Sequence, residues 1–351
     1  MTDERPIPSK QRRIRRFHRT RKAFDWKFWI GMGISGLFLF LAVRNVDFRE
    51  VGRAFAGANY WYLIPSAVAN LTGLWIRSLR WGVLLRPVRT VRMRDLFPCT
   101  VIGFMANNLF PARLGEFMRA IVLKRRTGIP ASAAFATIVL ERMFDGVTIL
   151  LVLLVIVGFL DLPFPDWLRK ASFASIVGFL ALLGFLVTLK LHTDKALRLF
   201  RAVLRPVPER WRDSLLRLLQ SFVDGLQMLH DWRSLVMSIV LSAGLWIFPA
   251  LAIYFALLAS GLFLPLSAAF FLLVVVVMGV IAPSAPGYVG TIQYMAVIGL
   301  ALFGVPKSTA LGFSILYHLT QYIPVTALGL VLFFSMGLSF SKIRETERLD
   351  G

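Results

Sequence analysis

The chain has 351 residues, of which 57% are apolar and only 17% are charged, and its mean hydropathy is +0.69. These values leave too little polar surface for soluble domains, so the sequence predicts an all-α, polytopic bundle in a membrane. The formal net charge of +21 favours basic residues placed against anionic lipid headgroups.

A basic arm precedes the first apolar segment. Residues 1–27 hold ten Lys and Arg residues, and the apolar run 28–43 follows without a small-residue cleavage site. We therefore expect a cytoplasmic arm joined to an uncleaved membrane anchor. Nucleic-acid binding is the rival interpretation of the arm, but juxtamembrane basic segments are common in membrane proteins, so we expect no nucleic-acid partner.

Six apolar segments are candidates for full membrane spans. Crossing a hydrocarbon core of roughly 30 Å takes about 20 helical residues. The expected spans are 28–43, 60–80, 131–160, 171–190, 235–258 and 309–336. The segment 195–230 is too polar to span, and its leucines recur at helical spacing with arginines between them, which predicts amphipathic helices on the cytoplasmic face.

Two further apolar segments, 95–124 and 265–303, are interrupted by proline. In the first, Pro111 lacks a backbone donor and biases Phe110 away from helix, which predicts a re-entrant helical hairpin. The second is expected to form a matching hairpin that enters from the external side of the membrane. Neither of its flanks is strongly basic, as the positive-inside rule requires of external segments. Its centre contains Pro283, Pro286, Gly287 and Gly290.

The basic residues give an orientation. The positive-inside rule places the richest segments, and with them both termini, in the cytoplasm of a bacterial-type inner membrane. These segments are 1–27, 77–94, 124–126, 190–233 and 342–348. The elements then form two repeats of opposite orientation, 28–160 and 171–336, followed by a tail, 337–351. Inverted repeats with broken helices are typical of alternating-access transporters, with a cavity between the hairpin tips.

Charged residues inside apolar segments are the main candidate site. A charge on the lipid-facing side costs from about 2.5 kcal/mol upward, so these side chains are expected to face inward and to pair. They are Arg113, Glu116, Arg119, Glu141, Arg142 and Asp145. The arginines suit a phosphate-bearing headgroup, because guanidinium binds phosphate bidentately, and the acids suit pairing, a cationic headgroup or proton transfer. The alternative is a set of internal ion pairs that only fastens the hairpin to the next span.

Neutral polar groups are expected at a similar depth. Asn107 and Asn108 precede the first break, where they either bind the headgroup or cap the helix, and Ser284, Gln293 and Gln321 lie in the second half. A lone cysteine, Cys99, and four histidines scattered in sequence predict no disulfide and no metal site. We expect no cofactor and leave a homo-oligomer open.

Four short motifs, taken together, are similar to those of a known family. They are Arg80-Trp81, Asn107-Asn108-x-x-Pro111-x-Arg113-x-Gly115-Glu116-x-x-Arg119, Glu141-Arg142-x-x-Asp145 and Pro283-x-x-Pro286-Gly287-x-x-Gly290. Over residues 75–325 the chain resembles the flippase-like family that includes the transmembrane region of lysylphosphatidylglycerol synthases. The resemblance implies movement of phospholipids or lipid-linked molecules between leaflets. We expect no soluble aminoacyltransferase domain after the last span, and therefore no synthase activity.

Three classes of function remain after this comparison. A lipid flippase is the leading hypothesis, without an evident nucleotide-binding loop and so without ATP as an evident energy source. A membrane-embedded transferase acting on a lipid carrier is disfavoured, because no Asp-x-Asp motif is present and the external loops are short. A non-transporting scaffold for envelope enzymes is the third. We therefore expect a transporter rather than an enzyme, with membrane lipids of anionic or phosphate-bearing headgroup as its partners.

Overall fold

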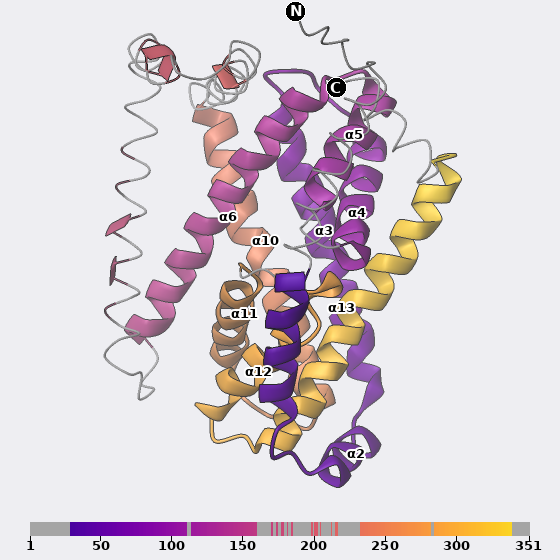
Figure 1. Cartoon of the computed structure of the whole chain (residues 1–351), viewed down its shortest axis with the longest axis vertical. Coiled ribbons are helices and arrows are strands. Elements are labelled where there is room, and N and C mark those ends of the chain that lie inside the picture. The colour runs from indigo at the N-terminus through magenta and orange to yellow at the C-terminus, as the bar shows by residue number, and fades with distance from the viewer. Residues whose placement is uncertain are drawn as a thin grey trace, which may run out of the picture.

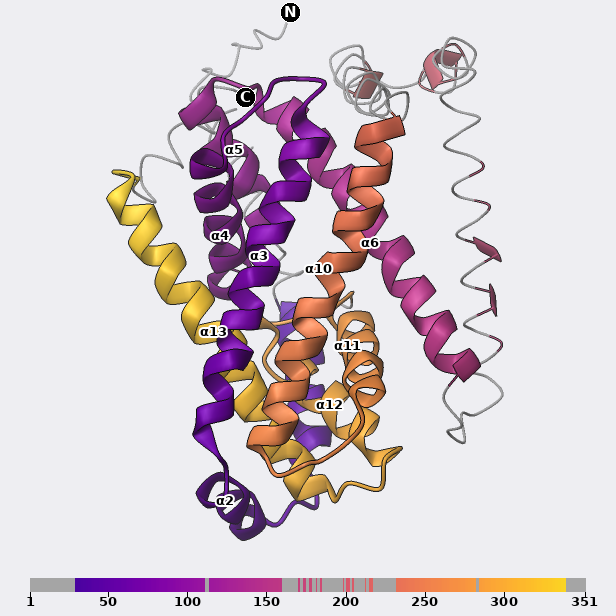
Figure 2. The same ribbon diagram turned by 180° about the vertical axis from the view of Figure 1, so that it is seen from behind.

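The computed structural model describes residues 29–110, 114–159, 232–281 and 284–338, together with scattered positions between 170 and 216. Every regular element in these residues is a helix, and the helices form an elongated bundle (Figures 1 and 2), which confirms the predicted all-α class. Most of the expected span 171–190 and of the amphipathic segment 195–230 lies outside the described residues, as do Pro111, Arg113 and Pro283.

The chain enters the bundle through the helix Trp29–Val43, which meets α2 (Phe48–Ala56) at an angle of 84°. The turn between them places Asn45 at a positive φ of 60°. The side chain of Asp47 then caps α2 by accepting a hydrogen bond of 2.8 Å from the Arg49 amide. This sharp bend lets α2 lie across one end of the bundle (Figure 1).

A short 3₁₀ helix, η1 (Tyr60–Tyr62), leads into α3 (Leu63–Leu85), which runs beside α10 (Trp232–Ala259) in the opposite direction (Figures 1 and 2). The two helices approach closely because α3 presents Gly73 to α10, where an added Cβ would lie 3.5 Å from the Phe248 Cβ. In the second half of α10, the carbonyl of Ala252 accepts a hydrogen bond of 2.8 Å from the buried hydroxyl of Ser66.

The helices α4 (Met93–Leu109) and α5 (Gly115–Thr127) form the first hairpin. Phe110 ends α4 with φ −116° and ψ 146°, the extended conformation expected before a proline. Across the break, the Asn107 side chain accepts a hydrogen bond of 2.8 Å from the Gly115 amide. A Cβ on Gly115 would overlap the carbonyl oxygen of Gly103, so the absence of side chains at this crossing allows the tight packing.

The helix α6 (Ala131–Phe159) follows the first hairpin and packs against α5, α3, α10 and α11. It crosses the bundle obliquely, so that its first half lies beside the first hairpin and its second half points away from it (Figures 1 and 2). Its one acidic pair, Glu141 and Asp145, therefore sits in the half that faces α3 and α5.

The second hairpin consists of α11 (Leu266–Ile281), the 3₁₀ helix η3 (Pro286–Tyr288) and α12 (Thr291–Ala301). It lies toward the end of the bundle that carries α2, whereas the first hairpin lies toward the other end (Figure 1). Like the first, it packs through glycine, because a Cβ on Gly299 would approach the Leu272 side chain to 2.7 Å.

The last described helix, α13 (Lys307–Ser335), runs the length of the bundle and packs against both hairpins (Figure 1). At its first residue, the Lys307 ammonium donates hydrogen bonds of 2.9 Å and 2.5 Å to the carbonyls of Leu41, in the last turn of the first helix, and Arg44, just after it. A single helix thus connects the two hairpins to the N-terminal bend.

The outer surface is apolar. Side chains such as Val240 on α10 and Val331 on α13 are 59% and 65% exposed, and many large apolar residues on the other helices are exposed as well. Such a surface suits hydrocarbon better than water. By length and composition, α10 and α13 are each able to cross a membrane, and the bent pair Trp29–Val43 with α2 adds a third such span if it counts as one.

Candidate functional site

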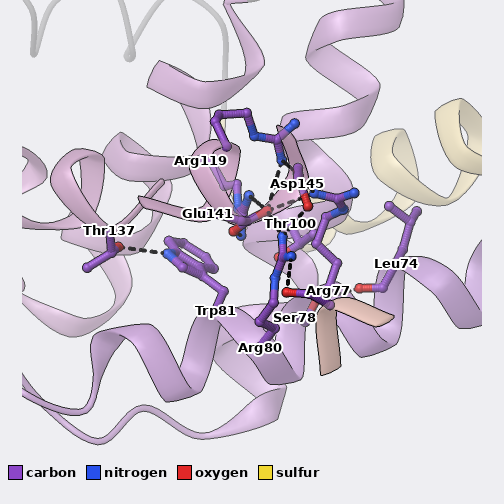
Figure 3. A network of polar contacts seen from close by, with 12 residues as sticks. Leu74, Arg77, Ser78, Arg80, Trp81, Thr100, Arg119, Thr137, Glu141 and Asp145 are labelled. Atoms are coloured by element: carbon purple, nitrogen blue, oxygen red, sulfur yellow. Dashed lines mark hydrogen bonds and ion pairs between the residues drawn. The ribbon is translucent and has the colours of Figure 1, made fainter. Parts of the chain in front are cut away.

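A network of charged side chains lies in the interior, where α3, α5 and α6 meet (Figure 3). Most of its members are almost fully buried, and Arg80 and Glu141 have no exposed surface. Its members, called the charge network below, are Arg77, Arg80, Arg119, Glu141, Arg142 and Asp145. Each buried ion loses several kcal/mol of hydration, so the network persists only if its members pair well.

Glu141 is the centre of the network. Its carboxylate accepts two hydrogen bonds from Arg119, of 3.1 Å and 2.7 Å, in the bidentate arrangement that guanidinium forms with carboxylate. The same carboxylate accepts from Arg77 at 3.0 Å and from Arg142 at 2.9 Å. One carboxylate of α6 therefore joins α5 and α3 in the interior of the bundle.

Asp145 lies one helical turn further along α6 and binds the other arginine of α3. Its two oxygens accept hydrogen bonds of 2.7 Å each, one from Arg77 and one from Arg80, and the Arg142 guanidinium lies 3.2 Å away. Arg80 donates a further hydrogen bond of 2.8 Å to the Ser242 hydroxyl, which brings α10 into the network.

Aromatic rings line the network. The Arg119 guanidinium carbon lies 4.0 Å from the centre of the Trp81 ring, a cation–π contact, and the Trp81 indole donates a hydrogen bond of 3.0 Å to Thr137. Arg77 contacts the rings of Phe104 and Trp246 at longer distances of 5.3 Å and 5.9 Å. These rings exclude water from one side of the ion pairs.

Positive charge exceeds negative charge in the described part of the network. Four arginines share two carboxylates, and counting Glu116, which interacts electrostatically with Arg142, still leaves one positive charge in excess. The Nε atoms of Arg80, Arg119 and Arg142 are buried without a hydrogen-bond partner among the described residues. Arg142 is the accessible member, with 38% of its side chain exposed.

The structure brings four of the predicted charges together, namely Arg119, Glu141, Arg142 and Asp145. It also adds two arginines that the sequence interpretation assigned to the cytoplasmic basic segment 77–94. That assignment of Arg77 and Arg80 was wrong, because α3 continues to Leu85 and turns both side chains toward α6. Their spacing of three residues within a long helix, next to the aromatic Trp81, was the available signal.

Asn107 and Asn108 lie outside the charge network, at the break of the first hairpin. Asn107 bridges the break to Gly115, and the Asn108 side chain donates a hydrogen bond of 2.9 Å to Thr326 on α13. The two roles expected for these residues were headgroup binding and capping of the helix at the break. In the structure both side chains form hydrogen bonds that fix the hairpin.

The breaks of the two hairpins meet inside the bundle. A Cβ on Gly287 in the second break would lie 3.3 Å from the Asn108 carbonyl oxygen in the first, and the Tyr322 hydroxyl is 3.5 Å from the same oxygen. Gly287 has a positive φ of 67°, so the close approach and the backbone conformation both favour glycine here.

Comparison with known proteins places most of the chain in one family. The family model for the lysylphosphatidylglycerol synthase transmembrane region matches residues 28–329. The chain belongs to this family. As a member of the lysylphosphatidylglycerol synthase transmembrane-region family, it is a multi-pass membrane protein, and the motifs from Arg80 to Gly290 all fall inside the matched region.

Two UPF0104 relatives are similar over most of their length. A UPF0104 membrane protein of Methanothermobacter thermautotrophicus is 26% identical over 310 residues, which is 84% of this chain and 90% of that protein. A UPF0104 membrane protein of Methanocaldococcus jannaschii is 22% identical, covering 85% of this chain and 91% of the relative. Glycosyltransferase AglD of Haloferax volcanii is 25% identical over 89% of this chain but only 54% of its own length.

Proposed function

We propose that this family member moves a lipid with a phosphate-bearing headgroup between the two leaflets by alternating access, and that it is not itself an enzyme. The observation that carries the proposal is the excess of positive charge in the described part of the charge network, which reaches the surface of the bundle at Arg142. Ion pairs that served only for structure would be expected to balance, because an unpaired buried charge is costly. A phosphate anion at Arg142 would supply the missing negative charge.

The hairpins support the transport part of the proposal. They lie toward opposite ends of the bundle, and their breaks meet near Gly287 and Asn108 (Figure 1). Two halves of opposite orientation with broken helices at matching positions can exchange inward-open and outward-open states around one central site. The basic segments at the ends of the expected spans favour an inner-membrane orientation with cytoplasmic termini.

Lipid movement in reconstituted vesicles tests this function. Purified protein in liposomes that contain phosphatidylglycerol should move a headgroup-labelled phospholipid between leaflets, measured by a quencher added outside. Arg142→Gln removes the accessible guanidinium and should slow the movement at least roughly ten-fold, the effect of losing one charge-assisted contact. Arg86→Gln, at an exposed arginine after the end of α3, is the matched control and should move lipid at the normal rate.

Two results would contradict the proposal. No lipid movement by well-folded protein with any anionic phospholipid or polyprenyl phosphate would remove the transport function. Normal movement by the folded Arg142→Gln protein would remove the headgroup site while leaving transport in place.

A transferase is the second candidate, favoured by the name of the relative AglD. That relative is almost twice as long as the matched region, since the alignment covers 54% of it. Incubating the purified protein with activated sugars and a polyprenyl phosphate acceptor decides between the two, because product formation by this chain alone would favour the enzyme over the transporter.

A further inference from the structure

A second polar cluster, separate from the charge network, holds the break of the second hairpin. It consists of Gln293 on α12, His318 on α13 and the backbone of Gly287 and Gly290. Both side chains are buried, with 5% and 8% of their surface exposed. We call residues 285–290, which these contacts hold in place, the second tip.

The hydrogen bonds of this cluster leave only one arrangement of protons. The Gly290 amide can only donate, so the atom of Gln293 that it contacts at 2.7 Å is the oxygen Oε1. The other end of Gln293 is then the NH₂ group, which only donates, and it lies 2.9 Å from Nδ1 of His318. Nδ1 must therefore accept, and it carries no proton.

The other nitrogen of the same ring is fixed independently. Nε2 of His318 lies 2.8 Å from the carbonyl oxygen of Gly287, which can only accept. Nε2 must therefore carry the proton and donate it. A backbone donor at one end and a backbone acceptor at the other thus hold His318 as the neutral Nε2–H tautomer.

A second proton does not fit. On Nδ1 it would face the NH₂ group of Gln293, donor against donor. Turning the amide of Gln293 over would present its oxygen to His318, but the NH₂ group would then face the amide of Gly290. In either case the protein loses one of the three buried hydrogen bonds that connect the Gly290 amide, Gln293, His318 and the Gly287 carbonyl.

No other charge compensates the added proton near this cluster in the described residues. The helices Trp29–Val43, α11 and α12 contain no Asp, Glu, Lys or Arg. The tyrosines of η3, α12 and α13 are Tyr288, Tyr294, Tyr317 and Tyr322, and the Tyr322 ring meets the His318 ring edge-on at 5.8 Å. The charged groups of α13, α4 and α3 are Lys307, held by two carbonyls, Arg94 and Asp95 in the first turn, and Arg77 and Arg80 in the charge network. The two other helices that contact α13 carry exposed charges only, namely Arg49, Glu50 and Arg53 on α2 and Arg233 on α10.

We propose that His318 is a proton-binding site that controls the second tip: the closed tip accepts only the neutral imidazole, and a proton on Nδ1 releases the tip from α13. The tip is the part of the second hairpin that meets the first, through Gly287 and the Asn108 carbonyl. A proton at His318 therefore loosens the contact between the two hairpins. Because the open tip solvates the ring, the open tip takes the proton more readily than the closed tip, and lower pH favours opening.

The coupling of this opening to transport rests on the proposed function, but the proton site does not. The first test therefore measures the tip itself. In protein reconstituted in lipid nanodiscs, hydrogen exchange of the peptide 285–294, normalised for the intrinsic rate, should become roughly ten-fold faster between about pH 8 and about pH 5, the effect of one lost buried hydrogen bond. The peptide 131–140, in the first turns of α6 beside the first hairpin, should not change.

Two variants should change the pH dependence of exchange at the tip in different ways. His318→Gln keeps a neutral donor for the Gly287 carbonyl and has no titratable group, so its tip should exchange at the same normalised rate at both pH values. Gln293→Glu provides one carboxylate oxygen for the Gly290 amide and a second for a protonated Nδ1. The proton then closes the tip instead of opening it, and exchange should slow as the pH falls.

Nitrogen NMR of histidine-labelled protein, with the His318 signals assigned by their loss in His318→Gln, gives the tautomer directly. At about pH 8 the Nε2–H form should dominate. A dominant Nδ1–H form, or tip exchange in the native chain that is independent of pH, would overturn the proposal. Lipid movement that is absent while the tip responds to pH as expected would overturn the proposed function and leave the proton site intact.

Discussion

Arg119 and Glu141 bind each other through two hydrogen bonds of 3.1 Å and 2.7 Å, while the same guanidinium lies 4.0 Å from the Trp81 ring centre. The pair joins α5 of the first hairpin to α6, and the ring that it covers belongs to α3. A single arginine therefore fixes the position of three helices. Because both partners are buried, the pair is far more expensive to break than an exposed ion pair.

Removing the central carboxylate should cost the most stability. Glu141→Gln leaves Arg77, Arg119 and Arg142 without one of their main acceptors, so the free energy of unfolding should fall by about 3–5 kcal/mol, as for other broken buried pairs. Arg142→Gln, at the most exposed arginine of the network, should cost no more than about 1 kcal/mol. Thermal unfolding in detergent micelles measures both, and equal losses would contradict a network centred on Glu141.

The close crossing of the first hairpin predicts a steric effect. Gly115→Ala would drive a Cβ into the Gly103 carbonyl and within about 2.5 Å of the Asn107 side-chain oxygen, so the protein should lose at least about 1–3 kcal/mol. Gly146→Ala, in α6 where an added Cβ meets nothing within 4 Å, is the matched control and should stabilise by up to about 1 kcal/mol. Destabilisation of similar size in both variants would show that the crossing is not specific.

Much of the helical arrangement follows from the sequence because long apolar runs and proline have few structural alternatives in a membrane. The segment expected at 235–258 corresponds to α10, Trp232–Ala259, and the break expected at Pro111 corresponds to the extended backbone of Phe110. Pairing among the charged residues of these segments was expected on the same grounds, since charges inside apolar helices need partners, but which residues pair was not specified.

Two features could not be predicted in the same way. Arg77 and Arg80 lie near a helix end in the sequence, where arginines ordinarily face the cytoplasm, and their partners are supplied by a helix more than 60 residues later. His318 and Gln293 belong to different helices, and no spacing pattern connects them. Both features depend on how the helices pack, which composition and periodicity do not specify.

The hydrogen bond of the Trp81 indole predicts a loss of stability smaller than that of Glu141→Gln, and a second threonine of α6 provides a control. Thr137→Val removes the acceptor of the buried Trp81 N–H at nearly constant volume, so stability should fall by about 1–3 kcal/mol. Thr148→Val, on the same helix, removes only a hydroxyl that binds the Phe144 carbonyl of its own helix, and it should cost less than about 1 kcal/mol. Unfolding free energies of the two variants, measured side by side, test the difference.

The two ends of the bundle should face opposite sides of the membrane. Cysteine at Arg125, an exposed position in the last turn of α5, should react with a membrane-impermeant maleimide only from the cytoplasmic side, because the basic cluster 124–126 follows the positive-inside rule. Cysteine at Phe263, 83% exposed in the loop between α10 and α11, should react only from the other side. The native Cys99 has no exposed surface and stays unlabelled in the folded protein, so single substitutions in the native chain suffice. Labelling of both cysteines from the same side would contradict the opposite orientation of the two halves, and with it the alternating-access mechanism proposed above.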